Sequence, residues 1–533
     1  MNKTACFILI LLGTFESLYS QKNDYIWLQG YESNDVIDSA TYGFRYGGTL
    51  LNFNTSPICV TYDSIQMNFN RTNTSYSDNN GNLLFYSDGL YISDSLNQMI
   101  QNSNGMNQGY IDEVWDPTIL TLGYTNQQGI IALQDIANTN FYYLIYSYDD
   151  SVPGSGGANV YTPQILTAYL DISANAGVGN VIYLNKPILN GDLGEEITAV
   201  KHGNGKDRWI LIQKRNTNCY YPILLTDTGF QIMLNLTCGG GEVSDTDIAS
   251  VSFSPDGSKF AHFAIIGGLN IYDFDRCTSE LSNPIYYPLD IWDDSSWLSN
   301  GVAFSPNSRF LYVSASKVLL QFDMWASNAP ASVDTVGRYD GFQLPFGSYF
   351  DKEQLAPDGK IYISCGNTEA DYHVISNPNG KGDSCNFEQH ALRLPTLSAC
   401  VPNYPNYRLG ALTGSACDTI TGLNETARSS LDQILKVFPN PATDITTIDY
   451  GFTDWNKGQP ALEICNALGQ TVYTQYLPMY SVTISVILPH PFRGILPHPL
   501  GWLFRSIVPH SFRAILLHPV SGCGFDVANV LVF

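Results

Sequence analysis

The feature that most constrains this chain is one hairpin-forming segment that occurs three times, about 50 residues apart. Each copy holds a short apolar stretch, a proline-containing turn and a second stretch in which apolar and polar residues alternate. The copies are residues 251–260, 302–310 and 355–363. In Ser254-Pro-Asp-Gly257 the proline presets its own φ and the glycine accepts a positive φ, which suits a tight turn. Repeats of this length indicate a propeller, a solenoid or an array, and the strand-turn-strand content favours a propeller.

Further strand pairs before these repeats predict the number of blades. Residues 80–92, 140–171 and 207–238 each contain two stretches typical of strands, which brings the blades from three to six. The strand near Ile26–Leu28 and the segment Asn406–Leu412 would pair to complete a seventh blade from both ends of the domain. We therefore predict an all-β fold, a β-propeller of about seven four-stranded blades over residues 24–415, with six or eight blades as alternatives.

The charge balance limits the partners of such a domain. The 533 residues include 26 Lys and Arg against 49 Asp and Glu, which gives a formal net charge of −23. Because an acidic surface repels a phosphate backbone, we expect no nucleic-acid partner. Aromatic residues make up 13% and charged residues only 14%, a composition that suits exposed strands and tight turns better than long surface helices.

Residues 1–20 predict export. A single Lys, a short apolar run and small residues before Gln21 are typical of a secretory signal peptide. The apolar run is too short to span a bilayer, and no later stretch has the pattern of a transmembrane segment. We expect a protein that is extracellular or on the outer cell surface, peripheral or surface-attached rather than membrane-spanning.

Eight of the eleven cysteines lie between Cys59 and Cys417. Export permits disulfides, and the candidate residues are Cys219, Cys238, Cys400 and Cys417. A hairpin around Asp227–Gly229 with the two-residue loop Thr228–Gly229 would place Cys219 directly opposite Cys238. Buried free thiols are the alternative for any of these cysteines.

The repeats resemble those of Tricorn-type and WD-type propellers, a likeness that is specific for fold and not for activity. Several further segments recur together in one order: Tyr25–Leu28, 81–86, 201–209, Tyr272–Cys277 and Pro402–Gly410. That arrangement resembles a group of secreted propeller proteins from Bacteroidetes bacteria. The resemblance covers most of residues 24–415 and implies export and architecture, without catalytic residues.

The chain changes character after the propeller. Residues 416–435 are a polar linker, and residues 436–480 contain Phe438-Pro-Asn-Pro-Ala442 and Leu468-Gly-Gln470 among short predicted strands. This part resembles the C-terminal sorting domain of the type IX secretion system, in which such a phrase opens the first strand of a small Ig-like β-sandwich. The resemblance implies that the type IX machinery is a partner and that the protein reaches the cell surface.

Residues 481–533 depart from that pattern. Four near-copies of a Pro/His phrase begin at Ile487, Ile495, Ile507 and Ile515. Because proline has no backbone N–H to donate to a ladder, we predict a disordered tail and an incomplete sandwich. The abrupt change of composition is typical of a frameshift or read-through, and a defective sorting domain would leave the protein in the periplasm.

Aromatic residues in predicted loops are the best candidates for ligand contact. Trp115, Trp292 and Trp297 lie in such loops beside acidic residues, an arrangement that favours stacking on sugars or peptides, although tryptophans also pack between blades. Acidic residues are plentiful, but no pattern selects the carboxylate pair that a glycosidase needs. We therefore predict a binding or scaffold module for an extracellular glycan or protein, without a metal or cofactor; a hydrolase of polysaccharide or peptide is the alternative.

Overall fold

A computed structural model describes most of the chain from residue 21 to residue 418. Left out are residues 34–44, 108–122, 155–156, 234, 241–248, 266, 290–298, 344–345 and 367, and beyond residue 418 only strand backbones between 435 and 516 are described. The chain divides into two compact units, Met1–Asp418 and Thr419–Phe533, which are treated separately below. None of the helices in the described part is long and apolar enough to cross a membrane.

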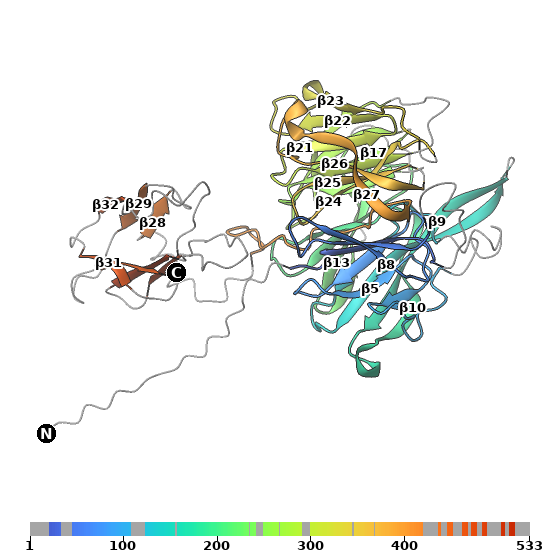
Figure 1. Cartoon of the computed structure of the whole chain (residues 1–533), viewed down its shortest axis with the longest axis horizontal. Helices are drawn as coiled ribbons and strands as arrows, with labels where there is room; N and C mark the ends of the chain where they lie inside the picture. The colour runs from blue at the N-terminus through green and yellow to red at the C-terminus, as the bar shows by residue number, and fades with distance from the viewer. Residues whose placement is uncertain are drawn as a thin grey trace. The chain divides into compact units, whose positions relative to one another are not determined.

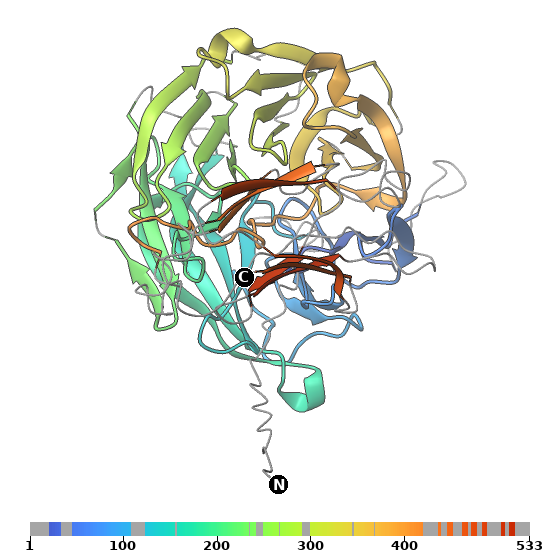
Figure 2. The ribbon, with the colours of Figure 1, turned by 90° about the vertical axis from the view of Figure 1, so that its left-hand side faces the viewer.

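The first unit is a ring of seven antiparallel sheets, which confirms the predicted all-β propeller (Figures 1 and 2). Blades 1 and 2 have three described strands, blade 4 has five, and the other blades have four each. Blade 1 comprises β1 (Ile26–Gly30), β2 (Gly48–Asn52) and β3 (Cys59–Asp63), and blade 2 comprises β4 (Thr74–Ser77), β5 (Leu83–Ser87) and β6 (Ile92–Asp94). Blade 3 comprises β7 (Ile130–Gln134), β8 (Phe141–Gly154), β9 (Gly157–Asp171) and β10 (Asn180–Leu193). Blade 4 comprises β11 (Thr198–Lys201), β12 (Arg208–Gln213), β13 (Cys219–Thr226), β14 (Gly229–Ile232) and β15 (Thr237–Cys238). Blade 5 comprises β16 (Ala249–Phe253), β17 (Lys259–Ala264), β18 (Gly268–Phe274) and β19 (Leu281–Tyr287). Blade 6 comprises β20 (Asn300–Phe304), β21 (Phe310–Ala315), β22 (Val318–Asp323) and β23 (Asp334–Arg338). Blade 7 comprises β24 (Phe350–Leu355), β25 (Ile361–Cys365), β26 (Glu369–Ile375) and β27 (Phe387–Ser398).

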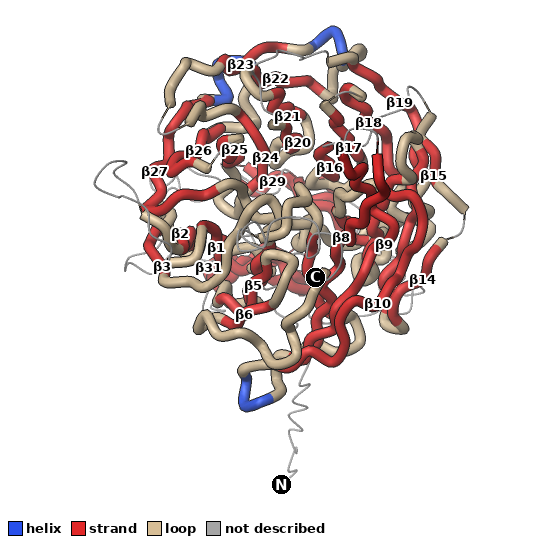
Figure 3. Tube along the Cα trace, turned by 90° about the vertical axis from the view of Figure 1, so that its right-hand side faces the viewer, coloured by secondary structure: helices blue, strands red, loops and turns tan. Residues whose placement is uncertain are grey.

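The three sequence repeats form the first hairpins of blades 5, 6 and 7. In Figure 3 their first strands, β16, β20 and β24, lie nearest the centre, and β19, β23 and β27 lie at the periphery. Side chains of the inner strands pack between neighbouring blades: Val302 and Phe304 of β20 share a core cluster with Phe263 of β17. The apolar alternation seen in the sequence therefore fills the spaces between blades rather than the central channel.

Ring closure differs from the prediction. Residues 406–412 form no strand; instead residues 399–418, here called the closing segment, run along the channel after β27. Pro402 and Pro405 have no backbone N–H for a ladder, and the segment binds the ring through side chains and through single backbone hydrogen bonds such as that from the Asn403 N–H to the Asn73 carbonyl, at 2.8 Å. β1 lies beside β4 and runs antiparallel to it. Asn73 Nδ2 donates to the Leu28 carbonyl and Ser75 Oγ donates to the Ile26 carbonyl, so residue numbers rise along one strand as they fall along the other.

The hairpin of Cys219 and Cys238 is formed, with a different turn. The structure joins the two cysteines by a disulfide, and they face each other across β13 and β15. The loop residues are Asp227 and Thr228, since Thr226 pairs with Gly229. The register therefore differs by two residues near the turn, and the break between β14 and β15 restores the expected facing pair.

The other two candidate cysteines do not form a pair. Cys417 is bonded to Cys277, 140 residues away in sequence, and so fixes the end of the closing segment to blade 5. Cys400, which was expected among the disulfide residues, is a buried free thiol. Of the candidates, Cys417 is bonded to Cys277, which follows β18 in blade 5, and Cys219 to Cys238, so no candidate is left for Cys400.

The second unit contains two described sheets, ordered β28-β29-β32 and β31-β30-β34-β33. Their strands are β28 (Leu435–Phe438), β29 (Ile445–Tyr450), β30 (Ala461–Asn466), β31 (Thr471–Tyr476), β32 (Val482–Ile487), β33 (Leu503–Ser506) and β34 (Ser511–Leu516). The last three strands lie in residues 481–533, the part for which the sequence predicts a disordered tail. Residues 482–487 read Val-Thr-Ile-Ser-Val-Ile, a β-branched alternation that suits a strand, and the prolines lie outside all three strands.

A candidate binding pocket in the central channel

The closing segment blocks part of the channel through one asparagine. The side-chain amide of Asn403 donates hydrogen bonds of 3.0 to 3.2 Å to three main-chain carbonyls, those of Gln128, Ile130 and Ile197. These carbonyls belong to the inner edges of blades 3 and 4, which have no further strand to pair with. Asn403 therefore supplies a donor to buried carbonyls at this inner edge, of which that of Gln128 also accepts the Ile197 N–H.

Two tyrosines hold the segment against the first three blades. Tyr404 donates its hydroxyl hydrogen to the Ile26 carbonyl at 3.0 Å, and Tyr407 donates to the Ala132 carbonyl at 2.8 Å. Both rings are buried among other aromatic side chains, including Trp27, whose ring centroid lies 5.9 Å from that of Tyr404. The channel is thus closed on the side of blades 1 to 3 and open toward blades 4 to 7.

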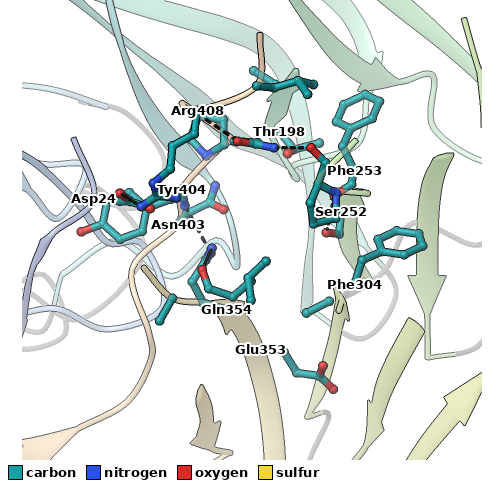
Figure 4. Close-up of a pocket in the computed structure, with 18 of the residues that line it drawn as sticks. Asp24, Thr198, Ser252, Phe253, Phe304, Glu353, Gln354, Asn403, Tyr404 and Arg408 are labelled. Atoms are coloured by element: carbon teal, nitrogen blue, oxygen red, sulfur yellow. Dashed lines mark hydrogen bonds and ion pairs between the residues drawn. The ribbon is translucent and has the colours of Figure 1, made fainter. Parts of the chain in front are cut away.

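The remaining space is a pocket of about 420 Å³ (Figure 4). Its walls are the inner strands β11, β16, β20 and β24, the closing segment, and the equivalent turn prolines Pro255, Pro306 and Pro357. At the turn of blade 5, Gly257 has φ +72°, and a Cβ there would lie 2.7 Å from the side chain of Leu409. This turn therefore requires glycine for two reasons, and the closing segment packs directly against it.

An ion pair supplies the main charges of the pocket. Arg408 of the closing segment binds Asp24, and the two side chains point toward each other in Figure 4. The Asp24 side chain is buried, whereas 34% of the Arg408 side chain is exposed. Burial raises the pKa of Asp24, and the guanidinium of Arg408 opposes that shift. The pocket thus combines planar donors and acceptors with little net charge.

A second carboxyl group borders the pocket at Glu353 of β24. Its Oε1 accepts a hydrogen bond of 2.6 Å from Ser314 Oγ, while Oε2 is buried with no hydrogen-bond partner among the described residues. Burial raises the pKa of Glu353 to about 8, so the group is protonated at neutral pH. A Cβ at Gly301 would lie 2.9 Å from Glu353 Cγ, so the side chain extends between blades 6 and 7.

The opposite end of the inner strands is closed by polar side chains. Gln127 Nε2 donates to the Asn300 carbonyl at 2.6 Å and to Ser250 Oγ at 3.1 Å, which ties together the inner strands of blades 5 and 6. Asp351 accepts a hydrogen bond from the Asn300 N–H at 3.1 Å and extends this network to blade 7. Because these groups bind each other, they stabilise the ring rather than present a site.

One cysteine–histidine contact has the residue types of a nucleophilic pair. Cys365 Sγ lies 3.5 Å from His373 Nε2, but both side chains are fully buried. His373 Nε2 also lies 3.1 Å from the Ser348 carbonyl, and Nδ1 accepts from the His390 N–H. Burial lowers the pKa of His373 to about 3 and raises that of Cys365, so neither group is activated. The described residues contain no cluster of His, Cys, Asp or Glu that could hold a metal ion.

The tryptophans predicted to bind ligand, Trp115, Trp292 and Trp297, lie outside the described residues. Arg408 and Glu353, in contrast, line the pocket and were not selected from the sequence. Glu353 had a sequence signal: when the three repeats are aligned on their prolines, it stands where the other copies have Val251 and Val302. Arg408 had none, because its place in the pocket depends on the path of the closing segment.

Residues 436–487 match the family described as secretion system C-terminal sorting domain. No curated protein matches the chain. Solved structures similar to it include a protein from Lactobacillus plantarum, at 13% identity over 71% of this chain and 99% of that chain, with a TM-score of 0.39. A candidate 6-phosphogluconolactonase from Bacteroides uniformis has 10% identity over 71% and 99% of the chains, with a TM-score of 0.36. Sqt1 of Saccharomyces cerevisiae has 10% identity over 81% and 91%, with a TM-score of 0.34.

The fold and the matched domain together define a class, a secreted β-propeller followed by a C-terminal sorting domain. More particularly, the sorting domain is of the type IX kind, which implies export to the cell surface or the extracellular space. The match ends at residue 487, where β32 also ends, so the domain extends beyond the boundary at residue 480 expected from the sequence.

Proposed function

We propose that this protein is an exported glycan-binding propeller whose ligand enters the central pocket. The pocket of about 420 Å³ carries this proposal, since its volume lies in the range of roughly 300–1,000 Å³ that small-ligand sites occupy. A sugar unit or two fits such a space, whereas a folded protein partner needs a broader surface.

The polar groups of the pocket favour a neutral ligand with many hydroxyls. The ion pair of Arg408 and Asp24 offers donors beside acceptors and cancels its own charge, in a chain whose formal net charge is −23. Amide groups of Gln354 and Asn406 line the same space, next to the apolar turn prolines. Planar polar side chains set among apolar walls are suited to the hydroxyls and the C–H faces of a sugar ring.

The test is retention of the full chain on a panel of immobilised cellulose, xylan, mannan and chitin, for the wild type and Arg408→Ala. We expect the variant to lose roughly tenfold to a hundredfold in affinity, because hydrogen bonds to a charged group contribute about 1.5–3 kcal/mol. Arg393→Ala is the matched control, since Arg393 also pairs with a buried aspartate, Asp371, at 2.6 Å and does not line the pocket. Equal losses in both variants would show that the pocket is not the binding site.

A hydrolase is the second candidate, because two carboxyl groups with raised pKa values, Asp24 and Glu353, border the same pocket. Binding is favoured over hydrolysis since Asp24 is held by Arg408 and the Glu353 carboxyl is bound to Ser314. A glycosidase needs both carboxyls directed at the scissile bond. New reducing ends in the panel incubations, lost in Glu353→Gln, would replace binding by hydrolysis.

A further inference from the structure

We infer that Trp325 is a second contact point for the same ligand, a stacking platform for a sugar ring of a glycan chain that extends out of the pocket. This inference rests on the proposed function. It assigns the ligand class more narrowly, to an oligosaccharide or polysaccharide of several units rather than a single small sugar.

Exposure distinguishes Trp325 from the other tryptophans that the structure describes. Trp27 and Trp209 are buried in the cores between blades, and each donates its indole N–H to a main-chain carbonyl. Trp325, in contrast, is 65% exposed. An exposed indole offers a large, flat apolar face with a polar N–H at its edge, which suits stacking on the C–H face of a sugar ring.

The indole is held in place from below by charged neighbours. Arg309 makes a two-pronged ion pair with Asp323, with distances of 3.0 Å from Nε to Oδ1 and 2.7 Å from Nη2 to Oδ2. The same guanidinium lies 5.1 Å from the centre of the Trp325 ring. Asp323 Oδ1 also accepts the backbone N–H of Trp325 at 3.1 Å. Because one ring face is fixed by these contacts, the exposed part is preorganised for stacking.

Trp325 lies at the same end of blade 6 as the turn that lines the pocket, because Asp323 at the end of β22 pairs with Phe310 at the start of β21. The turn that contributes Pro306 to the pocket wall also carries Arg309, whose guanidinium covers Trp325. Trp325 follows β22, which is two strands outward from β20 in blade 6, a step of roughly 10 Å at the usual strand spacing. A ligand chain leaving the pocket over this turn therefore meets the indole within a few sugar units.

The experiment measures the affinity of the full chain for the di- and hexasaccharides of β-linked glucose, xylose, mannose and N-acetylglucosamine by calorimetry. We expect wild type to prefer the hexasaccharide, and Trp325→Ala to lower the hexasaccharide affinity about fivefold to tenfold, so that the ratio of the two affinities falls. Arg408→Ala should lower the affinity for both lengths. Leu96→Ala, another exposed apolar side chain, in blade 2, is the control for surface truncation.

The outcomes separate the two claims. If no oligosaccharide binds the wild type, the proposed function itself is wrong. If both lengths bind and Trp325→Ala leaves their ratio as in wild type, the pocket is a glycan site and the inference about Trp325 is overturned. Trp325→Phe keeps an aromatic ring and should restore most of the ratio. The unfolding curve of Trp325→Ala, compared with that of wild type, shows whether the alanine variant has lost binding alone or also its fold.

Discussion

At the scale of single residues, Glu353 makes the stability of the propeller depend on pH. Its pKa in the folded protein is about 8, against 4.5 for an unperturbed group. The folded state therefore keeps a proton that the unfolded state has lost, so the contribution of Glu353 to stability is fully present below about pH 4.5, falls up to about pH 8 and then levels off. Glu353→Gln keeps the acceptor for Ser314 and removes this titration.

We predict that the free energy of unfolding of Glu353→Gln, measured by urea denaturation, falls less between about pH 5 and about pH 9 than that of wild type, by on the order of a few kcal/mol. Glu369 and Asp88, whose pKa values burial raises to about 8 and about 7, titrate with the same sign in both proteins and cancel in the comparison. Parallel curves for the two proteins would mean that Glu353 is ionised in the folded state.

Single residues also show which parts of the site could be predicted from the sequence and which could not. An alignment of the three repeats can identify Glu353, because it places this carboxyl group where the other two repeats have valine. Any residue that departs from a repeat pattern can be found in this way. The sequence did not indicate Trp325 as a ligand contact, because residue type alone does not show whether a side chain is exposed. Trp27 and Trp209 are buried, whereas Trp325 is exposed. The sequence identifies unusual residues, and only the packing shows which of them contact solvent.

At the scale of elements, the positions of the hairpin turns were predicted more accurately than the way in which the propeller ring closes. The proline turns of blades 5 to 7 follow from local φ preferences, and the facing pair of Cys219 and Cys238 follows from hairpin register. Within the closing segment, residues 406–412 were predicted to form a strand that pairs with the strand near Ile26–Leu28 and completes a seventh blade. Nothing local in the sequence indicates that Asn403 would bind carbonyls more than 200 residues away.

The two disulfides should differ in their effect on stability. Cys277–Cys417 closes a sequence separation of 140 residues and Cys219–Cys238 one of 19. If a disulfide acts mainly by restricting the unfolded chain, replacing both Cys277 and Cys417 by Ser should cost about 2 kcal/mol more than replacing both Cys219 and Cys238 by Ser. Guanidinium unfolding of the two double variants measures this difference. Equal costs would show that the long link does not limit the unfolded chain.

At the scale of the whole molecule, the closing segment joins the last blade to the first ones, so the propeller should need it to fold as one unit. A chain that ends after residue 418 keeps the closing segment and both disulfides and should unfold in one cooperative transition. A chain that ends after residue 398 lacks Asn403 and Tyr407, and it removes the side-chain donors of the Ile130 and Ala132 carbonyls, each at a cost of about 1–3 kcal/mol.

We therefore expect the shorter chain to show low hydrogen-exchange protection in β1, β4 and β7, the strands nearest the missing segment, and a broad or absent thermal transition. Blade 6 serves as the internal control, because the core clusters on its two sides contain no residue of the closing segment. Equal protection in both chains would mean that the blades close the ring by their own packing. The closing segment would then serve only to shape the pocket, and Arg408 and Asn403 would be free to change without loss of the fold.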